Sequence, residues 1–200
     1  MFHVARLLAA IAVLVVASAA QAQQSIRVSG TVESFDGRHL TLTSDKLGTV
    51  TVELRDNPAI FAVSKAALAD LKPGDFVGVG GTPLPDGSQR AIQVTIFSES
   101  QRGAGEGFRP WDRRPNGTMT NATVAETVAR VDGKVLTVKY KGGEKTIVVP
   151  PGAVILAYSA GNASELKPGA HVAVPRAVKQ PDGSLHADRV NVGRGDVVPK

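Results

Sequence analysis

Val32-Glu33-Ser34-Phe35-Asp36-Gly37 returns later in the chain as Val128-Ala129-Arg130-Val131-Asp132-Gly133. Two more turn motifs return in the same order: Leu71-Lys72-Pro73-Gly74 as Leu166-Lys167-Pro168-Gly169, and Pro85-Asp86-Gly87-Ser88 as Pro181-Asp182-Gly183-Ser184. The offsets are 128 − 32 = 96, 166 − 71 = 95 and 181 − 85 = 96, so the spacing of the motifs is kept. The chain therefore contains two copies of one small unit.

Each unit alternates apolar and polar residues with a period of two, which is typical of strands with one buried face. In the first unit this pattern predicts strands over 26–33, 40–43, 50–54, 76–79 and 91–97. Pro58 is expected to interrupt the third strand, and Ser64 to cap a short helix over 65–71. The second unit repeats the order, with strands over 124–128, 136–138, 147–149, 171–174 and 187–192 and a vestige of the helix at 164–166.

Three strands, a helix and two more strands is the element order of an OB-fold, a small Greek-key β-barrel. We therefore predict an all-β protein with two tandem OB-like barrels, each with five strands and a short helix. One larger sandwich or barrel that merges the repeats is the alternative. The predicted parts are a signal peptide (1–22), the first barrel (23–98), a linker (99–121), the second barrel (122–193) and a flexible tail (194–200).

The N-terminus predicts export from the cytoplasm. Arg6 precedes the apolar stretch Leu7–Ala17, and Ala20-Gln21-Ala22 is a cleavage site of small residues. The apolar stretch is shorter than the roughly 20 residues that a membrane span requires, although a retained N-terminal anchor is the alternative. Cleavage after Ala22 would leave a periplasmic protein without a membrane span.

The segment between the units, Ser98–Asn121, has no counterpart within the repeat. It is rich in glycine and continues as Phe108-Arg109-Pro110-Trp111-Asp112-Arg113-Arg114-Pro115, which holds the only tryptophan of the chain. Because Trp and Arg dominate binding hot spots, Arg109, Trp111, Asp112, Arg113 and Arg114 are candidate binding residues. We favour the alternative that Trp111 packs into the groove between the barrels and fixes their relative orientation.

Four stretches resemble a group of uncharacterised secreted bacterial proteins that are built from an OB-like domain of unknown function. They are Arg109–Asp112, Thr118–Val124, Tyr140–Pro151 and Leu166–Val172. The resemblance implies a Gram-negative periplasmic setting, and it brings no established activity and no site residue. Some relatives carry names that suggest metal-transporter permeases, but a permease is not expected here, because no spanning segment remains after cleavage.

The sequence offers few groups for catalysis or metal binding. The chain has no cysteine, which excludes disulfides, thiolate catalysis and Cys-based metal sites. His186 and Asp188 would share one face of a strand, and Met119 is the sole methionine after cleavage, so these three form a candidate copper or zinc site. We favour the alternative that His186 and Asp188 are two solvated residues on an edge strand.

We therefore expect a non-enzymatic periplasmic binding or assembly module without a cofactor, whose partner is a protein, a glycan or a small ligand. The alternative is a metal-handling accessory protein that binds copper or zinc. An enzyme is not expected, because turn chemistry explains the acids that both units share, Asp36 with Asp132 and Asp86 with Asp182. Nucleic acid is not an expected partner either, because the net charge of +5 is mild and the strand phenylalanines have the pattern of buried residues.

Overall fold

The computed structural model describes residues 24–130 and 133–199, so the predicted signal peptide and Asp132 lie outside the described residues. The prediction of an all-β protein is confirmed, since only short 3-10 turns accompany the strands in these ranges. The strands are β1 (Ser25–Phe35), β2 (His39–Ser44), β3 (Gly48–Lys65), β4 (Phe76–Pro83), β5 (Gln89–Ile96), β6 (Gly107–Pro110), β7 (Thr118–Arg130), β8 (Gly133–Tyr140), β9 (Gly143–Val149), β10 (Val154–Ala160), β11 (His171–Lys179) and β12 (Leu185–Gly193). The 3-10 turns are η1 (Leu68–Asp70), η2 (Glu99–Gln101) and η3 (Ala163–Glu165). Within these ranges, no helix has the length and apolar character needed to cross a bilayer.

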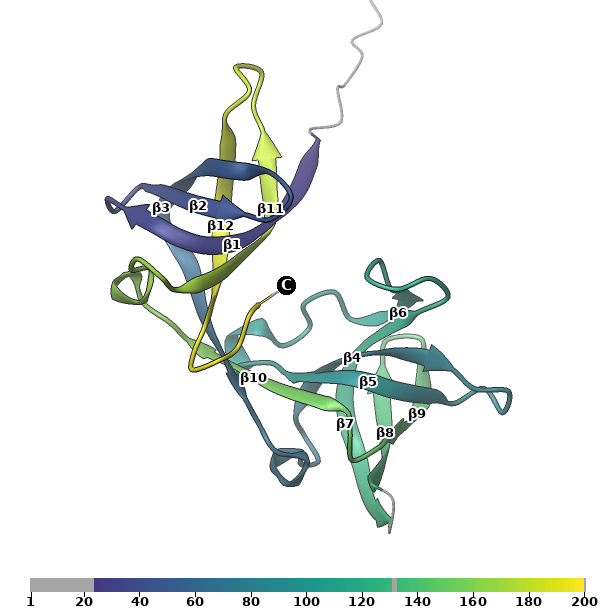
Figure 1. Cartoon of the computed structure of the whole chain (residues 1–200). Helices are drawn as coiled ribbons and strands as arrows, with labels where there is room; N and C mark the ends of the chain where they lie inside the picture. The colour runs from purple at the N-terminus through teal and green to yellow at the C-terminus, as the bar shows by residue number, and fades with distance from the viewer. Residues whose placement is uncertain (1–23, 131–132, 200) are drawn as a thin grey trace, which may run out of the picture.

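The strand pairings close into two rings of five strands. The first ring runs β1-β2-β3-β12-β11 and returns to β1, and the second runs β7-β8-β9-β5-β4 and returns to β7. We call the first ring lobe A and the second ring lobe B; Figure 1 shows them side by side. β10 pairs with β3 on one side and with β5 on the other, so it joins the two lobes.

Each lobe combines strands from both repeats, which differs from the prediction that each unit closes on itself. In the described chain, no strand pairing joins β1, β2 or β3 to β4 or β5 of the same repeat. The buried core of lobe A packs Leu40 and Leu42 with Val190, and the core of lobe B packs Val77 and Val79 with Leu136. The sequence boundaries at 98 and 122 separate the repeats, but the two cores do not follow them.

The end of β3 explains why each lobe combines strands from both repeats. The helix predicted over 65–71 is replaced by the single turn η1, because β3 continues to Lys65. The interruption expected at Pro58 lies where the register against β12 shifts, between Leu54 and Ala59 of β3. The strand nevertheless continues to Lys65, because 59–63 pair with β12 and 61–65 pair with β10, a strand that the sequence pattern did not predict. This pairing directs the chain into lobe B before the first ring is complete.

An approximate two-fold axis relates the two repeats and passes through the β3–β10 pair. Val63 and Tyr158 are partners in this pair, and they are also equivalent positions of the repeat, since 158 − 63 = 95. The parallel pair Val154–Gln93 has its equivalent in the pair Ala59–Arg189, since 154 − 59 = 95 and 189 − 93 = 96. The single chain therefore has the internal symmetry of an isologous dimer.

Two segments that were expected to be flexible are held by defined contacts. In the predicted linker, β6 pairs with β7, and the Asn121 side-chain amide donates to the Ala104 carbonyl at 2.9 Å. In the predicted flexible tail, Val197 and Pro199 are buried and Asp196 forms an ion pair with Lys65. Figure 1 shows that the tail ends between the two lobes.

Candidate functional site: the groove between the lobes

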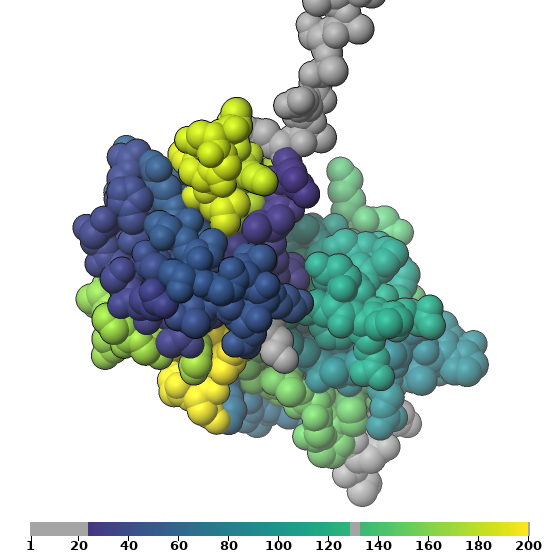
Figure 2. All heavy atoms as spheres, turned by 45° about the horizontal axis from the view of Figure 1, so that its top comes forward, coloured from purple at the N-terminus to yellow at the C-terminus, as the bar shows by residue number. Residues whose placement is uncertain are grey.

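A groove with a volume of about 680 Å³ lies where the two lobes meet. Figure 2 shows the lobes in contact side by side. The groove is lined by side chains of β1, β3 and β12 from lobe A, of β5, β6 and β7 from lobe B, of β10, and of the tail. Val63 and Tyr158 are among them, so the groove lies at the approximate two-fold axis. Its volume is typical of small-molecule sites.

A row of four aromatic rings runs from one lobe to the other, and its two middle rings, Phe97 and Tyr158, line the groove. Phe76 of β4 packs on Phe97 with ring centroids 5.6 Å apart, and Phe97 packs on Tyr158 of β10 at 5.8 Å. Tyr158 contacts Phe61 of β3 edge-on at 6.3 Å. Offset and edge-on aromatic pairs are favourable beyond the area that they bury, so this row stabilises the contact between the lobes.

Arg189 of β12 is fixed against this row. Its guanidinium lies 4.7 Å from the centre of the Phe61 ring and 5.8 Å from that of Tyr158. Its Nε donates to Asn191 Oδ1 at 3.1 Å, and Asn191 Nδ2 donates to Tyr158 Oη at 3.2 Å. Burial lowers the pKa of Arg189 and raises the pKa of Tyr158.

Trp111 packs on the outer face of β4, where glycine leaves room for it. Val77 and Val79 of β4 point into the core of lobe B, and Gly80 lies under the indole on the opposite face. A Cβ atom at Gly80 would lie 2.6 Å from Trp111 Cζ2, a distance that no side chain tolerates. The backbone N–H of Trp111 donates to the Gly117 carbonyl at 2.9 Å, which closes the loop that carries the indole.

Two polar atoms in the wall of the groove are buried without a hydrogen-bond partner. They are Nε1 of Trp111 and Oδ1 of Asn121, and these residues are 9% and 6% exposed. Both residues line the groove. Buried side-chain donors and acceptors are nearly always paired in proteins, so an unpaired donor and an unpaired acceptor in one wall distinguish this groove from an ordinary crevice.

Four of the five predicted binding residues, Arg109, Trp111, Asp112 and Arg113, line this groove. Arg114 is not among the lining residues; its backbone carbonyl accepts from the Gly117 N–H and thereby supports the loop. Asp112 Oδ2 lies 3.3 Å from Arg27 Nη1 of β1, so this ion pair connects lobe B with lobe A. The segment thus lines the groove and also contacts both lobes.

Four further residues of the groove were not predicted from the sequence: Arg27, Tyr158, Arg189 and Asn191. They belong to three strands that are distant in sequence, and one of these, β10, was not predicted. A signal existed in the repeat itself, because Arg189 and Asn191 occupy the positions where the first repeat has Gln93 and Thr95 (189 − 93 = 96 and 191 − 95 = 96). Differences between two copies of one fold mark positions that the fold does not dictate.

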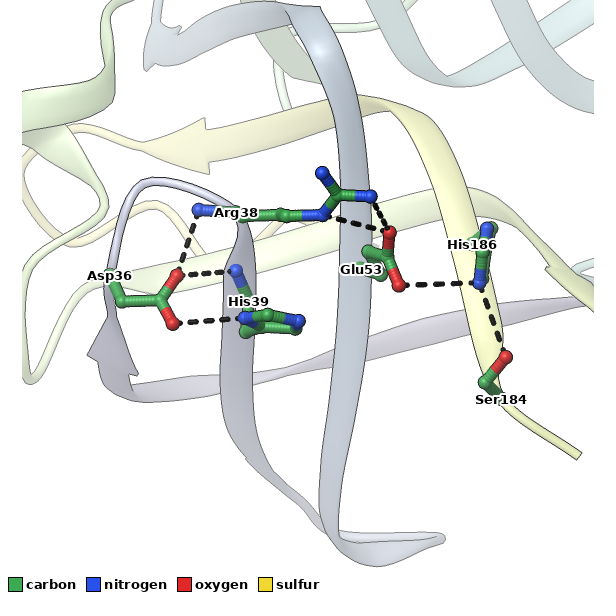
Figure 3. A network of polar contacts seen from close by, with 6 residues as sticks. All are labelled: Asp36, Arg38, His39, Glu53, Ser184 and His186. Atoms are coloured by element: carbon green, nitrogen blue, oxygen red, sulfur yellow. Dashed lines mark hydrogen bonds and ion pairs between the residues drawn. The ribbon is translucent and has the colours of Figure 1, made fainter.

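The structure does not gather the residues of the candidate metal site. Met119 lines the groove, but His186 lies on the surface of lobe A, where its Nε2 is 3.1 Å from Ser184 Oγ and 3.4 Å from Glu53 Oε2 (Figure 3). Asp188 is exposed, at the position where the register of β12 against β3 shifts. Across the described ranges, no group of three or more His, Cys, Asp or Glu side chains is placed to hold a metal ion.

The surroundings of His186 form a polar network that strand pairing explains. Glu53 is the register partner of His39 on one side and of His186 on the other, and Arg38 donates to it through Nε at 2.9 Å. Figure 3 shows Asp36 accepting from the backbone N–H groups of Arg38 and His39, at 2.8 and 2.7 Å. These hydrogen bonds hold the pKa of Asp36 and the pKa of Glu53 below their usual values. The network closes a hairpin turn and lies apart from the groove.

Comparison with known proteins locates one similarity. Residues 29–95 match the model of a family described as a domain of unknown function, DUF5666. No curated protein and no solved structure matches the chain significantly. The matched range covers the first repeat, whereas the stretches that carried the sequence resemblance lie between 109 and 172. A stretch whose strands contribute to both lobes is thus similar to a domain without an assigned function.

Proposed function

We propose that this protein is a non-enzymatic periplasmic binding module and that its ligand occupies the groove between the two lobes. The observation that carries the proposal is the pair of unpartnered buried atoms in the groove wall, Trp111 Nε1 and Asn121 Oδ1. A ligand in the groove would lie against the two residues that carry these atoms. The periplasmic location rests on the sequence of the N-terminus, Leu7–Ala22, as a cleaved signal peptide.

We further propose that each lobe is an OB-like barrel and that the two repeats exchange their last two strands. The support is the order of pairing, which is the same in both rings once β11 and β12 are assigned to lobe A and β4 and β5 to lobe B. In both rings the third and fourth strands, in the order given above, are parallel neighbours: β3 with β12, and β9 with β5. On this view, the groove is an interface between barrels rather than the usual binding face of one barrel.

Binding is favoured over catalysis by the chemistry of the groove. Its cationic groups are mainly guanidiniums, which do not exchange protons at neutral pH. The raised pKa of Tyr158 makes this phenol a weaker acid than usual, and the carboxylates Asp112 and Asp196 are engaged with Arg27 and Lys65. General acid–base catalysis needs a group whose pKa lies near the working pH, and these groups do not supply one.

Native mass spectrometry of the protein purified from the periplasm without chelator tests the proposal. We expect an adduct of small-molecule mass on the wild-type chain. Val198→Phe should reduce it about tenfold or more, because Val198 is exposed and lines the groove. The matched control is Val128→Phe, an exposed valine outside the groove, which should keep the adduct.

Two outcomes would contradict groove binding. One is a bare protein mass whose single-tryptophan emission does not respond to periplasmic extract. The other is an adduct that both phenylalanine variants retain equally. A stoichiometric copper or zinc adduct that is lost on His186→Ala or Met119→Ala would support the metal-handling alternative instead.

A further inference from the structure

We propose that the ligand of the groove is an amphipathic anion: a carboxylate, phosphate or sulfonate group attached to an apolar or aromatic body. This inference rests on the proposed function, since it assigns a ligand class to the same groove. It follows from three features of the lining: a guanidinium without an ion pair, an excess of positive charge, and an apolar surface at the mouth.

Within the described parts of the chain Arg189 forms no ion pair, and Asp188, its neighbour in sequence, is the one carboxylate whose charge acts on it. Its contacts are one hydrogen bond to the Asn191 side chain and two aromatic faces, and none of them is a carboxylate. A guanidinium has five N–H donors, so most donors of Arg189 are available to a ligand. A partly buried charge is unfavourable until it is paired, and a ligand anion would pair it.

The groove as a whole carries excess positive charge. Apart from Arg113, four cationic side chains line it, and two carboxylates balance them in part, which leaves 4 − 2 = 2 positive charges: Arg27, Lys65, Arg109 and Arg189 against Asp112 and Asp196. Asp112 pairs with Arg27 and Asp196 pairs with Lys65, so both carboxylates are already engaged. A cleft lined by one sign of charge concentrates ligands of the opposite sign.

The same groove exposes apolar side chains. Val154 and Val198, which are 52% and 54% exposed, both line it together with Leu156. Trp111 and Tyr158 add aromatic surface. Exposed apolar surface within a groove is a mark of a binding site. An inorganic anion would leave this surface in water, and a neutral apolar ligand would bury the guanidinium of Arg189 without pairing it.

A difference between two positions related by the approximate two-fold axis places the anionic group of the ligand beside β12. Gln93 of β5 is the equivalent of Arg189, and its side chain makes the equivalent contact, donating to Thr95 Oγ1 at 3.1 Å as Arg189 donates to Asn191. Only the β12 side carries a charge at this position. The ligand therefore binds in one orientation, with its anionic group beside β12, although the surrounding backbone is nearly symmetric.

Two fluorescent probes of similar shape test the inference with the mature protein. Anilinonaphthalene sulfonate carries an anionic group, and N-phenylnaphthylamine has the same aromatic body without it. We expect the sulfonate to bind about tenfold or more tightly than the neutral probe and to quench Trp111. Arg189→Gln should remove most of this preference, whereas the matched variant Arg176→Gln, which changes an exposed arginine outside the groove, should change either affinity less than about twofold.

The outcomes separate the inference from the proposed function. Equal affinities for the two probes, with no effect of Arg189→Gln and loss of both in Val198→Phe, would overturn the anionic ligand and retain groove binding. If neither probe quenches Trp111 and the native mass is bare, groove binding itself fails. A sulfonate affinity that inorganic sulfate abolishes at equal concentration would overturn the apolar part of the inference. Circular dichroism of each variant confirms that it remains folded.

Discussion

The two lobes have the same order of strand pairing, but one is built from a single stretch of the chain and the other from two separate stretches. Lobe B is one continuous stretch from β4 to β9, whereas lobe A is assembled from β1–β3 and from β11–β12, with all of lobe B between them. The repeat in the sequence therefore marks equivalent strands but not the segments that fold together. The same contrast appears at the groove, where Gly80 of the first repeat supports the Trp111 ring and the second repeat supplies Arg189.

The largest expected effect tests whether the lobes are energetically equivalent. Leu40 and Leu136 are equivalent core positions, since 136 − 40 = 96, and both are fully buried, one in each lobe. Leu40→Ala and Leu136→Ala should each lower the free energy of unfolding by about 2–5 kcal/mol, as large-to-small core changes do. Chemical denaturation followed by circular dichroism should give one transition for both variants, because β10 couples the lobes. Two separate transitions would show that the lobes unfold independently of each other.

The second prediction concerns the side of the groove that belongs to the first repeat. Gly80→Ala should lower the free energy of unfolding by about 1–3 kcal/mol, because the new methyl group overlaps the Trp111 ring. The emission of Trp111 should shift to longer wavelength as the indole moves into water. Pro175→Ala changes the equivalent residue of the second repeat (175 − 80 = 95) and should leave the emission unchanged. An unshifted spectrum in Gly80→Ala would mean that the indole is not held by β4.

A smaller effect is expected for the ion pair between the lobes. Arg27 and Asp112 are 38% and 70% exposed, so the pair should contribute about 0.2–1 kcal/mol. A double-mutant cycle with Arg27→Gln and Asp112→Asn measures the coupling, which should decrease at high salt. A coupling above about 2 kcal/mol would show that this pair, rather than the aromatic row, holds the lobes together.

The smallest effect compares the hairpin turns of the two lobes. Asp86 turns the β4–β5 hairpin and Asp182 the β11–β12 hairpin, and the pKa of each is lowered by hydrogen bonds from Ser88 and Ser184. Because the folded-state pKa is the lower one, each carboxylate stabilises the fold above its unfolded pKa, and this contribution is lost as the pH falls through the folded value. Asp86→Asn and Asp182→Asn should therefore lower the thermal midpoint slightly at pH 7, and the difference should vanish once the pH has fallen below the folded-state pKa of each carboxyl group. A variant whose deficit grows in acid would contradict the assignment.

Local patterns predicted most of the strands, because alternation and turn residues act over a few positions. β10 was missed, since Ile155, Ala157 and Tyr158 show no clean alternation. The helix expected at 65–71 did not form, because the preceding residues pair with a strand about 95 residues away in the sequence. The exchange of strands could not be read from the repeat, because each copy alone contains the elements of a complete ring. The segment 109–113 was found because tryptophan and arginine are conspicuous in a linker. Tyr158 and Arg189 required the three-dimensional pairing.

In the sequence, lobe B lies between the two parts of lobe A. This order affects when each lobe can close during synthesis. All strands of lobe B have been made once β9 emerges, so this lobe can close early. β1 must wait for β11, which is far behind it in the chain: Thr31 and His171, in contact across this pair, are 140 residues apart. During synthesis, β1 and β3 therefore expose open strand edges until β11 and β12 have been made, and unpaired edges are sites of aggregation. The last strand delivered, β12, closes lobe A and sets Arg189 against the aromatic row, so the groove is the final part of the molecule to form.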